Sequence, residues 1–166
     1  NLLNHQNYFF QEDFFFIGLT ETFKNFTQGY KPEDHLNNLF EALCKSTNFN
    51  PDEVKESSKK ALKKYQGKSI NEIIALISNK KKLHYSRLLI LGIYKVSTLA
   101  KDFEDNEDVS KIKVITDLID KLVLSKDRAE KDISIYKSNI KRFEQAKELL
   151  KETISEEREK RDRDKK

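Results

Sequence analysis

The amino-acid sequence predicts an all-α protein: a single helical-bundle domain with a long projecting C-terminal helix. Only 4 of the 166 residues are glycine and 2 are proline, so the turn residues that a β-sandwich or barrel needs are scarce. Apolar residues instead recur at steps of three and four residues, which is the spacing of helices. A chain of this length fits one domain, and we place the bundle in residues 1–125 and the long helix in residues 126–166.

The first two helices are predicted from apolar stripes and from the glycine and proline between them. A first helix over 13–28 places four apolar residues on one face, namely Phe16, Leu19, Phe23 and Phe26. Gly29 then ends it, and we expect a positive φ there because only glycine reverses the chain without steric cost. Pro32 suits the first position of the next helix. The apolar stripe of that helix comprises Leu36, Leu39, Phe40, Leu43 and Cys44. We expect the Cys44 thiol to be buried and inert.

Helix-start signals mark the next two helices. Asn50 can cap a third helix that runs from Pro51 to Gln66, with the proline at its first position. Ser69 and Glu72 have the spacing of a capping box. That box predicts a short helix over 70–77.

The central helix is predicted to be long and largely buried, over residues 83–103. Gly18 and Gly92 lie inside predicted helices, where each costs about 1 kcal/mol relative to alanine. We therefore expect a close helix contact at each of these glycines. An acidic link over 104–108 precedes a further helix over 110–124.

The last helix, from 126 to about 160, carries a narrow apolar seam. Its members follow alternating steps of three and four residues: Ile133, Tyr136, Ile140, Phe143, Lys147, Leu150 and Ile154. An intermolecular coiled coil is one interpretation of the seam. Packing of its first four members on the bundle is the other, and we expect these four to be buried. After Ile154 most residues are charged, so we expect this end to fray and to offer partners a handle that includes Glu156, Arg158 and Arg161.

Basic residues are concentrated in the middle of the chain. Residues 1–54 have a net charge of −5 and residues 55–87 a net charge of +8, within a total of +4. The densest cluster comprises Lys59, Lys60, Lys63 and Lys64, with Lys68 and Lys80–Lys82 nearby. Such a cluster is typical of a solvated face, of a surface for an acidic protein or an anionic membrane, or of a nucleic-acid site. Interleaved exposed aromatic residues, on which single-strand binders stack bases, are lacking.

The sequence contains no recognisable catalytic, metal or cofactor site. Its glycines are too far apart for a phosphate-binding loop, and its three histidines have no ligand partner at helical spacing. His84 and Ser86 would point to different sides of a helix, so no nucleophile, base and orienting group can be assembled. Cys44 is the single cysteine, which excludes an intrachain disulfide. The longest nearly apolar stretch, 83–100, is interrupted by charged residues and predicts no membrane span.

Three groups of residues carry a resemblance to a known family. They are Gly29, Tyr30, Pro32 and Cys44 within 26–34 and 39–44, then His84, Tyr85, Arg87 and Gly92 within 84–94, and finally 136–140 and 145–149 with Arg158. In their order and spacing, the chain resembles the thylakoid formation protein family, also described as the photosystem II biogenesis and repair factor. Members of that family usually carry further helical sequence ahead of the point where this chain begins.

The resemblance implies an all-α protein at the stromal or cytoplasmic face of thylakoids, peripheral to the membrane. It implies a non-catalytic auxiliary or adaptor factor that supports photosystem II assembly and repair together with the membrane-bound FtsH-type protease. Its partners would be that protease complex and photosystem II assembly or repair intermediates, and no cofactor, metal or nucleic acid is expected. The alternative is a basic helical nucleic-acid-binding protein, whose affinity would fall steeply with salt.

Overall fold

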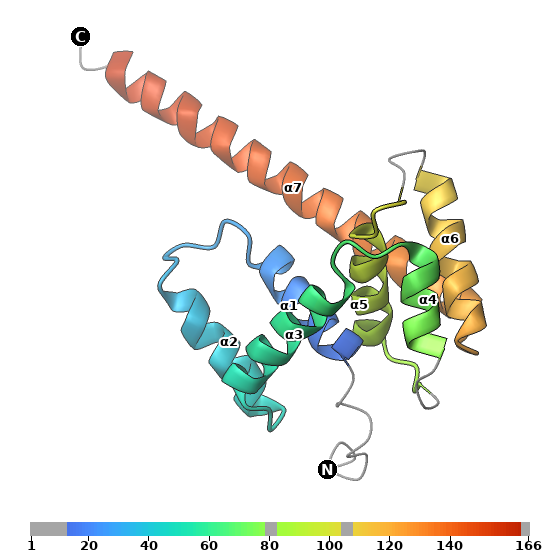
Figure 1. Cartoon of the computed structure of the whole chain (residues 1–166). Coiled ribbons are helices and arrows are strands. Elements are labelled where there is room, and N and C mark those ends of the chain that lie inside the picture. Colours follow the sequence, from blue (N-terminus) through green and yellow to red (C-terminus); the bar gives the residue numbers. More distant parts are fainter. Residues whose placement is uncertain (1–12, 79–82, 104–107, 164–166) are drawn as a thin grey trace. The chain divides into compact units, whose positions relative to one another are not determined.

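A computed structural model of the chain describes residues 13–78, 83–103 and 108–163, with side chains at all of them except 78, 108–114 and 162. The described residues form seven helices and no strand (Figure 1), so the predicted all-α class is confirmed. In chain order the helices are α1 Asp13–Phe26, α2 His35–Ser46, α3 Pro51–Tyr65, α4 Ile70–Ser78, α5 Arg87–Thr98, α6 Asp108–Lys121 and α7 Lys126–Arg163. Lys80–Lys82 and most of the predicted acidic link lie outside the described residues.

The chain divides into two compact units, residues 1–133 and residues 134–166. The first unit contains α1 to α6 and the first turns of α7, and the second contains the rest of α7. None of the helices among the described residues combines the length and the apolar composition that crossing a membrane requires.

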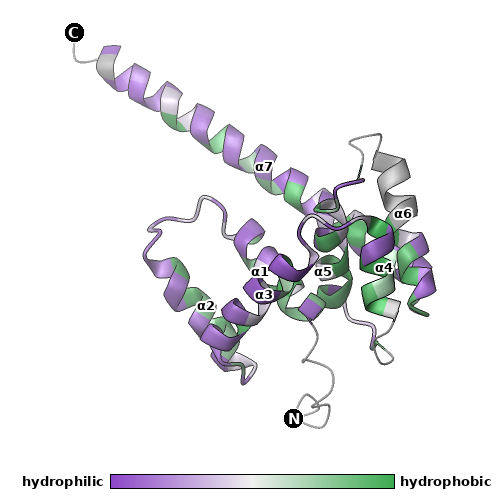
Figure 2. Ribbon diagram, in the orientation of Figure 1, coloured by the Kyte–Doolittle hydropathy of each residue, from purple (hydrophilic) through white to green (hydrophobic). Residues whose placement is uncertain are grey.

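The core of the first unit is formed where α1 packs on α5. Figure 2 shows α5 as largely hydrophobic. The buried apolar side chains that these two helices contribute to this core are Phe14, Ile17, Leu89, Ile90, Ile93 and Val96. The Phe14 ring also stacks on Tyr65 of α3 with 5.1 Å between ring centroids, a favourable separation for an aromatic pair. Burial of each such side chain contributes about 1.5–3 kcal/mol to the hydrophobic driving force.

Two glycines let the backbones of α1 and α5 touch. A Cβ atom added at Gly18 would collide with the backbone carbonyl of Leu88, and one added at Gly92 would collide with that of Phe14. Glycine is therefore required at both positions for this helix pair to pack as closely as it does. The predicted close contact at each glycine is confirmed.

A second, smaller apolar cluster lies on another side of α1. Phe16, Leu19 and Phe23, three members of the predicted stripe, pack there against buried Phe40 and Cys44. Helix α1 thus has two apolar faces. The spacing in the sequence identified only the face that meets the smaller cluster, and it missed the face that forms the main core.

Cys44 is fully buried, as predicted. Burial raises the pKa of its thiol, and the positive charge of Lys55 opposes that rise only in part. Leu39 and Leu43, placed on the same apolar stripe by the sequence, keep 40% and 38% of their surface exposed. Each precedes a buried residue by one position, which is about 100° around the helix, and therefore lies at the edge of the packed face.

Local signals in the sequence are found in the structure. The Asn50 side chain accepts hydrogen bonds from two backbone N–H groups in the first turn of α3, at 2.9 and 3.3 Å. The capping box closes in both directions, because Glu72 accepts from the Ser69 N–H at 2.6 Å and Ser69 accepts from the Glu72 N–H at 3.2 Å. Gly29 has φ 86°, which confirms its predicted left-handed conformation.

Helix α5 is shorter at both ends than the predicted range 83–103. Ser86 has an extended backbone, and its hydroxyl caps the first turn by accepting a backbone N–H at 3.1 Å. Beyond the last turn, the N–H of Lys101 donates to the carbonyl of Lys68 at 3.0 Å. Before it, the N–H groups of Leu99 and Ala100 already donate to carbonyls three residues back, at 3.1 and 3.2 Å, so the helix has ended and periodicity alone overestimated its length.

The start of α2 also differs from its prediction. Pro32 lies in a turn before the helix, where the carbonyls of Pro32 and Glu33 accept bonds from the N–H groups of His35 and Leu36 at 3.2 and 3.1 Å. These bonds span three residues rather than four, and the helix begins only at His35. The remaining helix ends fall within about three residues of their predicted positions, which is ordinary for boundaries.

Candidate partner-binding site

A groove of about 320 Å³ lies on the first unit between α1 and α3. Its lining includes four lysines, Lys24 from α1 and Lys55, Lys59 and Lys63 from α3. The three lysines of α3 share one face of the helix because steps of four residues return to the same side. We call this feature the basic groove.

The lysines of the basic groove are largely without neutralising partners. The Nζ of Lys55 lies 3.4 Å from the Asn37 side-chain oxygen and 5.2 Å from the centre of the Phe40 ring. Lys24, Lys59 and Lys63 are exposed and form no ion pair with a carboxylate of the described residues. Clustered charges of one sign in a concave surface focus a positive potential.

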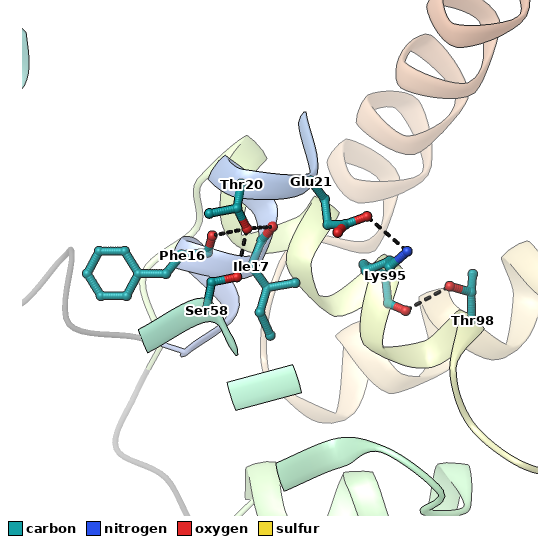
Figure 3. Close-up of polar contacts among 7 residues, drawn as sticks. All are labelled: Phe16, Ile17, Thr20, Glu21, Ser58, Lys95 and Thr98. Carbon is teal, nitrogen blue, oxygen red and sulfur yellow. Dashed lines mark hydrogen bonds and ion pairs between the residues drawn. The ribbon is translucent and has the colours of Figure 1, made fainter. Parts of the chain in front are cut away.

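The one carboxylate in the lining, Glu21, is already paired. Its Oε2 lies 2.9 Å from the Nζ of Lys95 on α5, and only 15% of the Glu21 side-chain surface is exposed (Figure 3). This pair connects the wall of the groove to the core helix. It also leaves the four lysines of the groove without an acidic counterpart within the lining.

Two hydroxyl groups hold the walls of the groove together. The Thr20 hydroxyl donates to the carbonyl oxygen of Phe16 at 2.9 Å, and the carbonyl oxygen of Ile17 lies 3.1 Å from the same hydroxyl (Figure 3). The Thr20 Oγ1 also lies 2.7 Å from the Oγ of buried Ser58. Because Thr20 uses its only proton on the backbone, Ser58 is the donor between the two hydroxyls. Both hydroxyl protons are therefore used within the protein, and the lysine ammonium groups remain to recognise an anion.

The predicted lysine cluster is divided by the fold. Lys59 and Lys63 line the basic groove, whereas Lys60 pairs with Glu56 at 2.7 Å and Lys64 with Asp13 at 3.4 Å, neither of them in the lining. Sequence analysis missed Lys24 and Lys55. The four-residue step from Lys59 back to Lys55 was a usable signal, but Lys24 comes from another helix and gives no signal of its own.

The second unit presents apolar side chains along α7. Exposed fractions are 63% for Leu149, 61% for Leu150 and 43% for Ile154. Among the four seam members expected to be buried, Ile133 is fully buried in the first unit, but Phe143 keeps 37% of its surface exposed and its predicted burial is wrong. Tyr136 and Ile140 are half-buried.

The charged residues predicted at the end of α7 are all exposed. Glu156, Arg158 and Arg161 belong to the second unit, and Arg161 lies 3.7 Å from Glu157 one turn earlier. Such an exposed pair contributes little to stability. These residues and the basic groove are in different units.

Two of the central motif residues, Tyr85 and Arg87, contact the same carboxylate, that of Asp132. Tyr85 donates to Asp132 at 2.7 Å, and the Arg87 Nε lies 3.0 Å from the other oxygen of the same carboxylate. The guanidinium of Arg128 lies 4.3 Å from the centre of the Tyr85 ring. Burial and the hydrogen bond to Asp132 raise the pKa of Tyr85. His84 is exposed.

Among the residues that the structure describes, no group of three or more His, Cys, Asp and Glu side chains could hold a metal ion.

The motif residues Gly29, Tyr30 and Pro32 form the connection between α1 and α2, where the Tyr30 side chain is 40% exposed.

Comparison with known proteins agrees with this structure. A family model described as "Thylakoid formation protein" matches residues 1–83 and 64–165. The chain is 57% identical over 154 residues to Protein Thf1 of Prochlorococcus marinus subsp. pastoris, covering 92% of this chain and 76% of that protein. It is 34% identical over 167 residues to Protein Thf1 of Synechococcus sp. strain CC9605, covering 98% and 78%.

A solved structure of Psb29 is similar over most of its length. The TM-score is 0.79 at 26% sequence identity, and the match covers 96% of this chain and 82% of that one. The family model spans nearly the whole sequence, and relatives above 30% identity are covered over more than two thirds of their length. The chain therefore belongs to the thylakoid formation protein family.

Proposed function

We propose that this protein is a non-catalytic adaptor in thylakoid biogenesis and photosystem II assembly or repair, acting with the membrane-bound FtsH-type protease. Membership of the thylakoid formation protein family supports the thylakoid role. We place the protein at the stromal or cytoplasmic face of the thylakoid, peripheral to the membrane. The protease complex and photosystem II intermediates are its proposed partners.

The observation that carries an adaptor role is the exposed apolar surface of the second unit. Leu149 and Leu150 each leave more than half of their side-chain surface in water on a helix that is otherwise mainly charged. Exposed leucines on a helix do not stabilise their own domain, but they supply contact area when another protein covers them. We therefore assign the partner handle to α7 from Phe143 onward.

The test is co-isolation of the tagged protein from illuminated photosynthetic cells. In the double variant Leu149→Ser and Leu150→Ser, recovery of the protease and of photosystem II intermediates should fall about tenfold or more, because two exposed contacts of about 1 kcal/mol each are lost. The matched control is Ser134→Ala with Ser138→Ala, which changes two exposed polar residues of the same helix ahead of the handle and should co-isolate like the natural chain. Unchanged recovery in the leucine variant would contradict the handle.

A further inference from the structure

We propose that the basic groove between α1 and α3 binds an extended, acidic segment of a partner protein. This inference concerns the first unit and is independent of the handle on α7. The basic groove can therefore fail its test while the adaptor function stands, and the reverse also holds.

The first argument is charge. Lys24, Lys59 and Lys63 have no carboxylate partner among the described residues, and the lone acid of the lining is neutralised by Lys95. The hydroxyls of Thr20 and Ser58 are bonded to each other and to the backbone. An incoming ligand therefore meets several free ammonium groups, whose natural partners are carboxylates.

The second argument is spacing. Lys55, Lys59 and Lys63 succeed one another by four residues in α3, which is about 6 Å along the helix axis. In an extended chain, side chains on one side repeat every second residue, or about 6.6 Å. A segment with acidic residues at alternate positions can therefore place one carboxylate near each lysine of the row, with Lys24 facing from the other wall.

The third argument is an apolar contact. The side chain of Leu62 in the lining offers apolar contact to one uncharged residue between the acids.

The same features disfavour the other polyanions. The lining contains no aromatic side chain on which the bases of a single strand could stack. An anionic membrane presents a plane of headgroups, whereas the lysines of the groove line a hollow between two helices. We therefore assign a protein segment as the occupant.

The test uses the full chain and a fluorescein-labelled peptide with glutamate at alternate positions, separated by serine and leucine. Fluorescence anisotropy should show binding in about 50 mM salt that weakens in about 300 mM salt, because the added ions screen the attraction between the lysines and the glutamates. The same peptide with glutamine for glutamate should not bind. Absence of binding by the acidic peptide in the lower salt would overturn the proposal.

The chain offers a matched pair of variants on one helix. Lys59→Gln with Lys63→Gln removes two charges from the basic groove, and affinity should fall about tenfold if each contact contributes about 0.7 kcal/mol. Lys60→Gln with Lys64→Gln removes the same charge from outside the lining and should change affinity no more than about twofold. Equal losses in the two variants would mean that net charge alone attracts the peptide, and the site would be wrong.

Two further measurements complete the test. Lys24→Gln, on the opposite wall, should lower the affinity for the peptide as much as the substitution of one α3 lysine of the groove does. An unchanged affinity would mean that the peptide binds elsewhere. Vesicles containing phosphatidylglycerol and a single-stranded oligonucleotide serve as competing probes. Unlabelled acidic peptide is the reference competitor, and all concentrations are counted in negative charges. If the vesicles or the oligonucleotide displace the labelled peptide at a lower concentration than the unlabelled peptide does, the proposed occupant is wrong.

Discussion

At the scale of single residues, the buried carboxylate of Asp132 determines much of the local chemistry. Only 11% of its side chain is exposed, and its oxygens are taken by the Tyr85 hydroxyl and the Arg87 guanidinium. An unpaired buried carboxylate would be costly, so both partners contribute to stability. Sequence analysis singled out Tyr85 and Arg87 as motif residues but could not find Asp132, because 47 residues separate it from Tyr85.

The first prediction concerns Tyr85→Phe. Near pH 8 the change should lower the free energy of unfolding by about 1–2 kcal/mol, because Asp132 loses a buried donor. The folded-state pKa of Tyr85 is raised, so this stabilisation is complete below the unfolded-state pKa of about 10 and is lost as the pH rises toward the folded-state pKa. In urea titrations from about pH 8 to about pH 11, the difference in the free energy of unfolding between the natural chain and the variant should therefore decrease.

Tyr30→Phe is the control for that series, because it removes the same hydroxyl from a side chain that is 40% exposed. Its free energy of unfolding should stay within about 0.5 kcal/mol of the natural chain. The prediction would be contradicted if the difference in the free energy of unfolding between Tyr85→Phe and the natural chain stayed constant over the whole pH series. The hydrogen bond of the Tyr85 hydroxyl would then not be what responds to pH.

At the scale of helices, the contact between α1 and α5 depends on the absence of side chains. The second prediction is that Gly18→Ala destabilises the protein by about 3 kcal/mol or more, because the added methyl group meets the Leu88 carbonyl and the helices must separate. Gly67→Ala is the comparison, since nothing lies within 4 Å of its added atom and only its positive φ is strained. That change should cost about 1 kcal/mol, and similar melting temperatures for both variants would contradict the close crossing.

How much of each helix could be predicted depends on whether its signals are local. The cap at Asn50 and the box at Ser69 act within one turn, and both were found in the sequence. Beyond the end of α5, the N–H of Lys101 bonds to the carbonyl of Lys68, which is distant in the chain, so periodicity does not reveal that the chain has left the helix there. The main-core face of α1 was missed because apolar residues occupy two sides of that helix.

The basic groove shows the same limit. Lys59 and Lys63 stand out in the sequence because they lie in a dense lysine cluster. Their separation from Lys60 and Lys64 requires the packing of α3 against α1, which turns one row of lysines toward the groove. The position of Lys24 opposite that row also follows only from the folded helix pair.

At the scale of the whole molecule, stability is concentrated in the first unit. The fully buried residues of α7, Ala129 and Ile133, lie in that unit, whereas residues 155–161 and 163 are exposed. The third prediction is that deletion of residues 155–166 shifts the melting temperature by less than about 2 °C, because that segment buries almost no apolar area. A chain that unfolds after this deletion in a calorimetric scan would show that the segment supports the core.

The complete burial of the single cysteine has a practical consequence. Since Cys44 is the only cysteine and its thiol is fully covered, a second cysteine at exposed Gln66, in the lining of the basic groove, would be the only thiol open to a maleimide dye. The natural residue need not be replaced first, so the smaller apolar cluster around it stays intact. An environment-sensitive dye attached there would report, by its change in emission, each time the groove is occupied.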